Sequence, residues 1–72
     1  MKKLNAIVFD DLLGYGFEAT YKNYKVRYCN SNIQLFTVDN YYLTSFICTT
    51  RKVYEFKNII KNKINEIIKV RG

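Results

Sequence analysis

Few residues of this chain could perform acid–base or nucleophilic chemistry. The sequence contains no histidine, so the usual catalytic triads and most proton shuttles are excluded. Asp10 and Asp11 are neighbours, and their side chains point to opposite faces of a strand or about 100° apart on a helix, so they cannot share one substrate. The candidate nucleophiles lack an activating base: Cys29, Cys48, Ser31 and Ser45. We expect no catalytic residues and no enzymatic activity.

The sequence also offers no site for a cofactor or a metal. No glycine-rich phosphate loop follows a predicted strand and opens a predicted helix. A structural zinc would need acidic ligands or a second chain, because histidine is missing. The predicted strand order places Cys29 and Cys48 two strand spacings apart, about 10 Å, whereas a disulfide needs Cα atoms within about 7 Å. Both cysteines are therefore expected to stay reduced.

Charge restricts the choice of partners. The 72 residues include 12 Lys and Arg against 6 Asp and Glu, which gives a net charge of +6. Such a protein attracts phosphate polymers and anionic surfaces without a specific site, and it cannot imitate DNA, which would require a carboxylate-rich surface. Asp10 and Asp11 interrupt the apolar stretch nearest the amino end, so we expect neither a signal peptide nor a membrane span, and a cytoplasmic location.

The candidate binding residues lie between Tyr24 and Thr49, where alternation predicts three antiparallel strands. Turns at residues 30–32 and at Asp39–Asn40 divide the side chains between two faces. One face is apolar: Tyr24, Val26, Tyr28, Phe36, Val38, Tyr41, Leu43 and Ile47. The other mixes two cations with apolar and small polar groups: Lys25, Arg27, Cys29, Ile33, Leu35, Thr37, Tyr42, Thr44, Phe46 and Cys48.

Three explanations compete for this mixed face. In the first, residues 4–13 cover it and its apolar side chains form a second small core. In the second, it is a protein interface, because interface cores favour aromatic residues and arginine. The candidate partner-binding residues are then Lys25, Arg27, Ile33, Leu35, Tyr42 and Phe46. In the third, Tyr42 and Phe46 stack on nucleic-acid bases. The phosphates are then contacted by Lys22, Lys25, Arg27, Arg51 and Lys52.

One helix and a small sheet must position these residues. A stripe with steps of three and four predicts an amphipathic helix over residues 51–70: Val53, Phe56, Ile60, Ile64 and Ile67, widened by Ile59, Ile68 and Val70. Thr49 or Thr50 is the expected N-cap, because a hydroxyl can accept a bond from a free amide of the first turn. The stripe is expected to cover the apolar face of the sheet.

The amino-terminal third has two interpretations. Spacing over residues 4–12 fits a short helix closed by Gly14, whereas residues 6–9 fit a strand, which is our prediction. A helix here, followed by three strands and a helix, would match the order in double-stranded-RNA-binding modules, but the glycine-rich and histidine-bearing loops of those modules are missing. Alternation predicts a further strand over Phe17–Tyr21.

The sequence thus predicts an α+β fold. A small antiparallel meander of three to five short strands, within residues 4–49, packs on one long carboxyl-terminal amphipathic helix at residues 51–70 in a single domain, residues 1–72. The predicted function is that of a small non-enzymatic binding module. We expect a regulator or inhibitor of the mobile-element type that docks on a larger host protein or nucleoprotein machine. The same face would also permit a homodimer. The alternative is a protein that binds DNA or RNA directly through the basic and aromatic sheet face.

Overall fold

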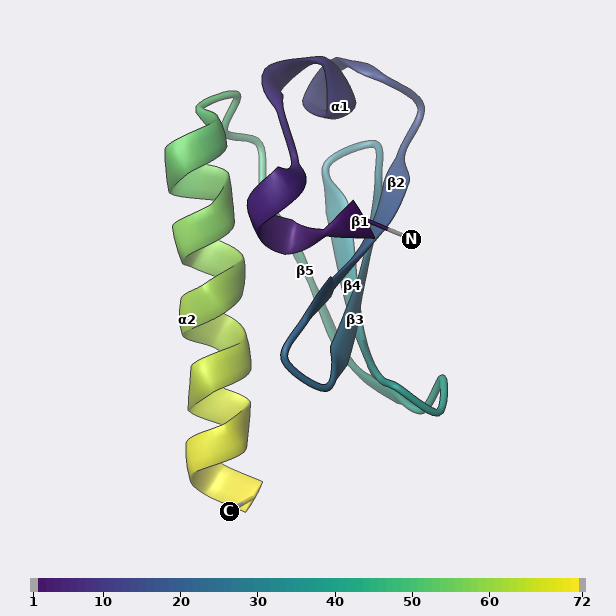
Figure 1. Cartoon of the computed structure of the whole chain (residues 1–72), viewed down its shortest axis with the longest axis vertical. Coiled ribbons are helices and arrows are strands. Elements are labelled where there is room, and N and C mark those ends of the chain that lie inside the picture. The colour runs from purple at the N-terminus through teal and green to yellow at the C-terminus, as the bar shows by residue number, and fades with distance from the viewer. Residues whose placement is uncertain (1, 72) are drawn as a thin grey trace.

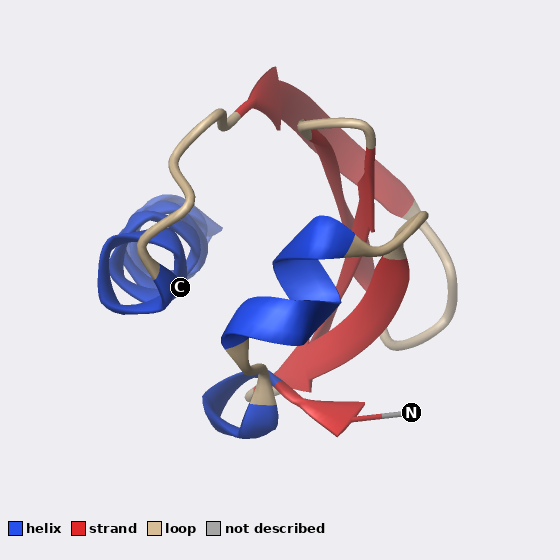
Figure 2. Cartoon of the chain, turned by 90° about the horizontal axis from the view of Figure 1, so that it is seen from above, coloured by secondary structure: helices blue, strands red, loops and turns tan. Residues whose placement is uncertain are grey.

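The computed structural model describes residues 2–71 and has the predicted α+β architecture (Figure 1). The elements in chain order are β1 Lys2–Lys3, the 3-10 helix η1 Leu4–Ala6, α1 Phe9–Leu13, β2 Phe17–Tyr21, β3 Tyr24–Cys29, β4 Asn32–Thr37, β5 Tyr42–Ile47 and α2 Val53–Arg71. The strands form one sheet in the order β1-β2-β3-β4-β5, in which β1 runs parallel to β2 and the other neighbours are antiparallel. Seen from above, the sheet curves around the helices, which all lie on its concave side (Figure 2).

The core lies between this inner side of the sheet and the helices. Its fully buried side chains of largest volume come from the amino-terminal segment, β3, β4 and α2: Leu4, Ile7, Leu12, Val26, Ile33, Leu35, Phe56, Ile60 and Ile64. Three aromatic rings pack together at its centre, because Phe56 of α2 contacts Phe17 and Tyr28 at centroid distances of 5.7 and 5.2 Å. Edge-to-face contacts of this kind add to the free energy gained by burying the rings.

The sheet differs from the predicted one by a single residue at the turn between β3 and β4. This turn contains two residues, Asn30 and Ser31, both with positive φ, so Cys29 pairs with Asn32. Positive φ at both central residues is typical of the tight hairpin turns that match strand twist. The predicted three-residue turn was therefore wrong, and with it the faces assigned to β4 and to most of β5, because a one-residue slip exchanges the two faces of a strand. Tyr42 and Leu43 keep their predicted faces, since the register shift beside Leu35 and Phe36 reverses the slip at the start of β5.

The pairing of β4 with β5 agrees with the prediction over most of its length, since Leu35 pairs with Thr44 as the predicted turn implies. The turn itself is longer. It spans residues 38–40, with Asn40 at φ 69°, and a register shift beside Leu35 and Phe36 compensates for the extra residue. Cys48 is buried and Cys29 is exposed, both as free thiols, so they lie in different environments and not on one face as predicted.

The amino-terminal segment is helical where a strand was predicted. Residues 6–9 form no strand, and α1 ends before Gly14, as in the alternative interpretation. Four strands, not three, separate α1 from α2, so the order of double-stranded-RNA-binding modules is not reproduced. Leu4, Ile7 and Leu12 enter the same hydrophobic cluster as α2. The segment therefore adds to the inner core and does not cover the other face of the sheet.

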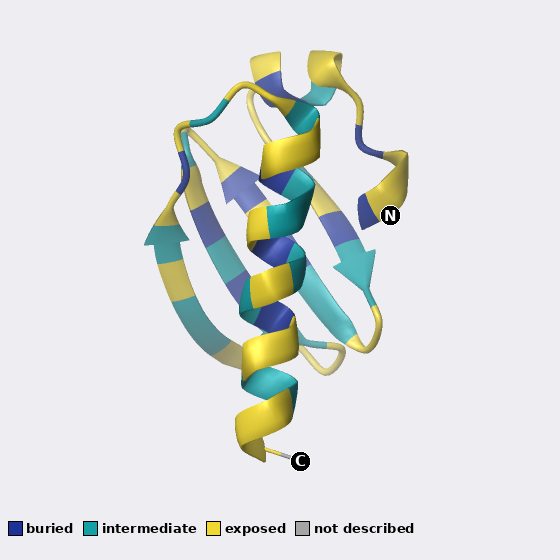
Figure 3. Cartoon of the chain, turned by 90° about the vertical axis from the view of Figure 1, so that its left-hand side faces the viewer, coloured by how far each residue is buried: buried dark blue, intermediate teal, exposed yellow. Residues whose placement is uncertain are grey.

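Helix α2 begins two residues later than predicted and ends one residue later. Figure 3 shows it lying across the sheet, with the buried positions on the side that faces the strands. Ile59 and Val70, which were expected to widen the apolar stripe, are exposed. The Thr50 hydroxyl accepts a bond from the backbone N–H of Lys52 at 3.2 Å and donates to the Glu55 carboxylate at 3.0 Å. These two bonds connect the segment before the helix to its first turn.

Asp11 gives the amino-terminal helix a stabilisation that depends on pH. Its carboxylate accepts a bond from the Val8 backbone N–H at 2.8 Å and pairs with Lys2 at 2.9 Å. The pKa of Asp11 is held below its ordinary value of 3.8. The bond from the Val8 backbone makes the larger contribution, and the contact with Lys2 makes a smaller one. Because the folded-state pKa lies below that of the unfolded chain, this stabilisation is fully present above the unfolded pKa and is lost as the pH falls through the folded one.

We therefore expect Asp11→Asn to lower the thermal midpoint of unfolding near neutral pH, and the difference from the wild type to shrink as the pH falls below about 4. Circular dichroism melts across this range measure the effect. Asp10→Asn is the control, since it removes a charge from the same turn but neither of these two bonds. A difference that stays constant down to the lowest pH would contradict the role of the Asp11 carboxylate.

Candidate binding surface

Within residues 2–71, no helix covers the convex face of the sheet (Figure 2). Strand pairing places its side chains in three rows across the strands: Cys29, Asn32 and Ile47; Glu18, Arg27, Gln34 and Ser45; and Thr20, Lys25, Phe36 and Tyr42. We call these residues the outer sheet face. Ile47 and Tyr42 are 76 % and 53 % exposed, so large apolar and aromatic groups on this face are in contact with solvent.

The structure divides the six predicted partner-binding residues between two faces. Ile33 and Leu35 are fully buried in the core, so their predicted place on an accessible surface was wrong. Phe46 is half-buried against the same core, with the Lys63 ammonium 5.8 Å from its ring centroid. The remaining three lie together on the outer sheet face: Lys25, Arg27 and Tyr42.

A continuous set of contacts crosses the outer sheet face from β2 to β5. The Arg27 guanidinium pairs with Glu18 at 3.0 Å and lies 5.4 Å from the centroid of the Phe36 ring. Phe36 in turn contacts Tyr42 edge-to-face at 5.8 Å, and the Tyr42 hydroxyl donates to Ser45 at 3.0 Å. These contacts hold an arginine and two aromatic rings in fixed positions on an open surface. Such pre-ordered side chains lose less conformational entropy when a partner binds.

The outer sheet face carries little excess charge. Glu18 compensates Arg27, and the Lys25 ammonium donates to the Asn40 side chain. The five predicted phosphate-contacting residues are not gathered into one surface either. Lys22 lies in the turn after β2 and bonds to Asn65. Arg51 and Lys52 precede α2, where Arg51 donates to the Leu12 carbonyl and Lys52 pairs with Glu55. Several turns of the helix therefore separate these two residues from Lys22, which lies beside Asn65.

Sequence reasoning missed two residues of this face, Phe36 and Ile47. Both were assigned to the apolar face beneath the helix, because the predicted β3–β4 turn was one residue too long. The Asn30-Ser31 pair was the available signal, since asparagine accepts positive φ and two-residue hairpin turns are common. A two-residue turn at that point places both residues outside and their neighbours Leu35 and Phe46 inside.

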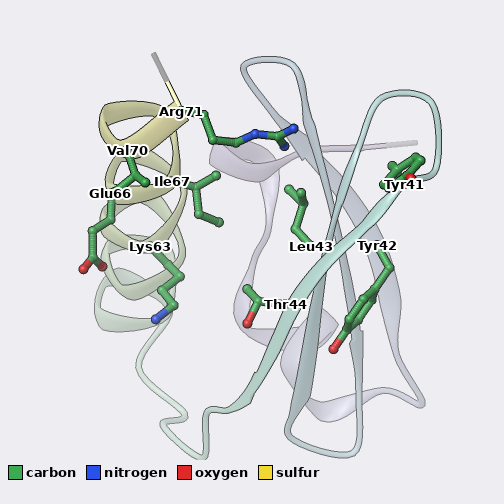
Figure 4. A pocket seen from close by; sticks show the side chains of 9 residues that line it. All are labelled: Tyr41, Tyr42, Leu43, Thr44, Lys63, Glu66, Ile67, Val70 and Arg71. Atoms are coloured by element: carbon green, nitrogen blue, oxygen red, sulfur yellow. The ribbon is translucent and has the colours of Figure 1, made fainter.

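A groove continues this surface around the edge of the sheet (Figure 4). It lies between the start of β5 and the carboxyl-terminal half of α2 and has a volume of about 470 Å³. The groove is lined by Tyr41, Tyr42, Leu43, Thr44, Lys63, Glu66, Ile67, Val70 and Arg71. Figure 4 shows Leu43 and Ile67 between the helix and the sheet, while Tyr42 points to the far side of the sheet. The edge strand β5 contains neither a charged residue nor proline, the usual means of protecting an edge.

The fold and the surface together define a small α+β protein with a sheet open on one side and helices on the other. No known family model matches the sequence, and neither a curated protein nor a solved structure is significantly similar to it. Residues 2–71 contain no cluster of three or more His, Cys, Asp or Glu that could hold a metal. None of the helices in that range combines the length and the apolarity that crossing a membrane requires.

Proposed function

We propose that this protein is a binding module that acts without catalysis, by docking the outer sheet face onto a larger partner protein. The observation that carries the proposal is the cluster of Arg27, Phe36 and Tyr42 on a sheet face that no helix of the described chain covers. A few hot-spot residues carry most of the binding free energy of a protein interface, and arginine and tyrosine are enriched among them. A regulator or inhibitor of this size works by occupying a surface of its partner.

The chemistry of the surface favours a protein over a nucleic acid as the partner. The Glu18 carboxylate beside Arg27 would repel a phosphate backbone, while it suits a polar rim around an apolar contact. Exposed Tyr41 and Tyr42 extend the apolar area toward the groove beside β5, and Ile47 adds an exposed apolar side chain at the other end of that strand. The complementary partner surface is expected to be apolar at its centre, with hydrogen-bond acceptors placed for Arg27 and Lys25.

Tyr42→Ala tests this proposal once a partner is captured from cells with the wild-type protein and purified. We expect the variant to bind that partner at least tenfold more weakly, because truncating an interface hot spot costs about 2 kcal/mol or more. Biolayer interferometry after nuclease treatment measures the change. Tyr54→Ala is the matched control, because Tyr54 is equally an exposed tyrosine but lies on α2, away from the outer sheet face.

Equal weakening by Tyr42→Ala and Tyr54→Ala would contradict the proposal, as would full affinity of Tyr42→Ala. Sedimentation analysis of the purified protein tests whether a second copy of this chain binds the outer sheet face. A concentration-dependent dimer that is lost in Tyr42→Ala would show that the outer sheet face binds a second copy of this chain instead of a larger protein.

A further inference from the structure

Four lysines meet on the side of the molecule where α2 passes η1 and the turn between β2 and β3. Lys22 lies in the turn between β2 and β3, and Lys61 lies on α2. Their ammonium groups are 5.3 and 5.9 Å from the centroid of the Tyr21 ring. Lys57 donates to the backbone carbonyl of Asn5 at 2.8 Å. The fourth is Lys3, which lines a cavity of about 330 Å³ together with Leu4, Asn5, Thr20, Tyr21 and Lys22. We call Lys3, Lys22, Lys57 and Lys61 the lysine seam.

The positive charge of the lysine seam is not compensated by carboxylates. Within residues 2–71, the ion pairs involve three other cations, Lys2, Arg27 and Lys52, so none of the seam lysines is paired with an acid there. The hydrogen-bond partners of Lys22 and Lys57 are neutral oxygens of Asn65 and Asn5. Lys22 and Lys61 flank the Tyr21 ring, Lys57 lies one helical turn from Lys61, and Lys3 lines the same cavity as Lys22, so their positive charges add to one local potential.

The acids of α2 lie away from the seam. Glu55 contacts Thr50 and Lys52 before the helix, and Glu66 lines the groove beside β5. The helix therefore presents lysines toward η1 without an acid among them, while its acids face elsewhere. A net charge of +6 spread evenly would not produce this separation. The separation is a property of the fold, because it depends on which side of α2 packs beside Asn5 and Tyr21.

We propose that the lysine seam binds the phosphate backbone of a nucleic acid. The cavity is lined by two residues that carry neutral hydrogen-bond donors, Asn5 and Thr20, together with Lys3 and Lys22. Phosphate contacts of this kind position a nucleic acid and do not read its sequence. Thr20 belongs to the edge of the outer sheet face, but the four seam lysines lie outside that face, so this inference does not depend on the proposed protein partner.

A nucleic acid fits the seam better than a membrane surface does. Binding to a bilayer combines positive charge with apolar side chains that enter the headgroup region. None of the exposed large hydrophobic residues lines the cavity, where Leu4 is buried and Tyr21 is half-buried beneath two ammonium groups. Binding through phosphates requires only the charges and the donors, which the seam has.

The test compares two variants that make the same change in net charge on the same helix. Lys57→Glu combined with Lys61→Glu reverses two seam charges, whereas Lys63→Glu combined with Lys69→Glu reverses two charges outside it. Fluorescence polarisation measures binding of labelled random-sequence duplex DNA, double-stranded RNA and single strands at about 50 and 200 mM salt. Circular dichroism verifies that each variant folds, and the corresponding Lys→Gln pairs replace any variant that does not.

We expect the seam variant to bind at least about tenfold more weakly and its slope of log K against log salt on duplex DNA to fall by about 1.8, or 0.9 for each lost phosphate contact. The control pair should change the affinity by less than about threefold. Tyr42→Ala should leave this binding unchanged, so failure of the seam and failure of the protein interface are distinguishable. Equal losses in both lysine pairs, absence of binding at the lower salt, or binding to phosphatidylserine vesicles alone would overturn the inference.

Discussion

Replacing Ile33 by Asp should unfold the protein at 25 °C. Ile33 is fully buried in β4, opposite Tyr28 and Phe46 in the strand pairing. Removing its side chain costs about 2 to 5 kcal/mol, and burying an unpaired carboxylate costs several more. A domain of this length is expected to have a free energy of unfolding of only about 4 to 11 kcal/mol. The far-ultraviolet circular dichroism of Ile33→Asp should therefore show loss of the native helix and sheet.

The same substitution at Ile47 is the matched control. Ile47 is 76 % exposed on the outer sheet face, so a carboxylate there stays in water and Ile47→Asp should remain folded. The pair also tests the strand register, because the three-residue turn expected from the sequence would place Ile47 beneath α2 and Ile33 outside. If Ile47→Asp unfolds and Ile33→Asp does not, the strand pairing described above is wrong.

Phe56→Ala should give the largest loss of stability among the core truncations. Its ring is fully buried and packs edge-to-face against Phe17 and Tyr28, so one helix residue joins α2 to both β2 and β3. Truncating a buried phenylalanine costs about 3 to 5 kcal/mol through lost transfer free energy and the cavity left behind. Urea unfolding followed by circular dichroism measures the change as a lower midpoint with a similar slope.

Phe9→Ala provides the comparison for this measurement. Phe9 begins α1 and is 50 % exposed, so its truncation removes less buried area and should cost less than about 1 kcal/mol. A cost for Phe56→Ala no larger than that for Phe9→Ala would contradict the central position of the aromatic cluster in the core.

The outer sheet face and the lysine seam assign different ligands to different sides of one small fold. The outer face offers Arg27, Phe36 and Tyr42 with compensated charge, whereas the seam offers uncompensated lysines around Tyr21. A module with both properties could bring a partner protein and a nucleic acid together. Because the two sets share no residue, variants of each should affect only their own ligand.

Part of the candidate site could be predicted from the sequence because it depends only on local alternation. Lys25 and Arg27 alternate with Val26 and Tyr28 along β3, and the structure places the first two outside and the other two in the core. The stripe of Phe56, Ile60 and Ile64 gave the buried side of α2 for the same reason. In both elements, one side is clearly more apolar than the other, so the periodicity allows one solution.

The lysine seam could not be predicted, since its members come from β1, the turn after β2, and α2. In the sequence, Lys57 and Lys61 are ordinary helix-surface lysines of the kind that usually forms a solvated face. Their significance arises from the packing of α2 beside Asn5 and Tyr21. Segments far apart in the chain have to be placed before such a surface exists.

By itself, the sequence determined the fold class, the long amphipathic helix and the absence of histidine-based chemistry. Tertiary structure decided which side of β4 faces the core. Strand β4 has apolar residues on both sides, Ile33 and Leu35 on one and Phe36 on the other. Alternation within the strand therefore permits either face to be buried. The positive φ of Asn30 and Ser31 closes the turn in two residues, and burial of Ile33 and Leu35 against α2 and the amino-terminal segment stabilises that choice.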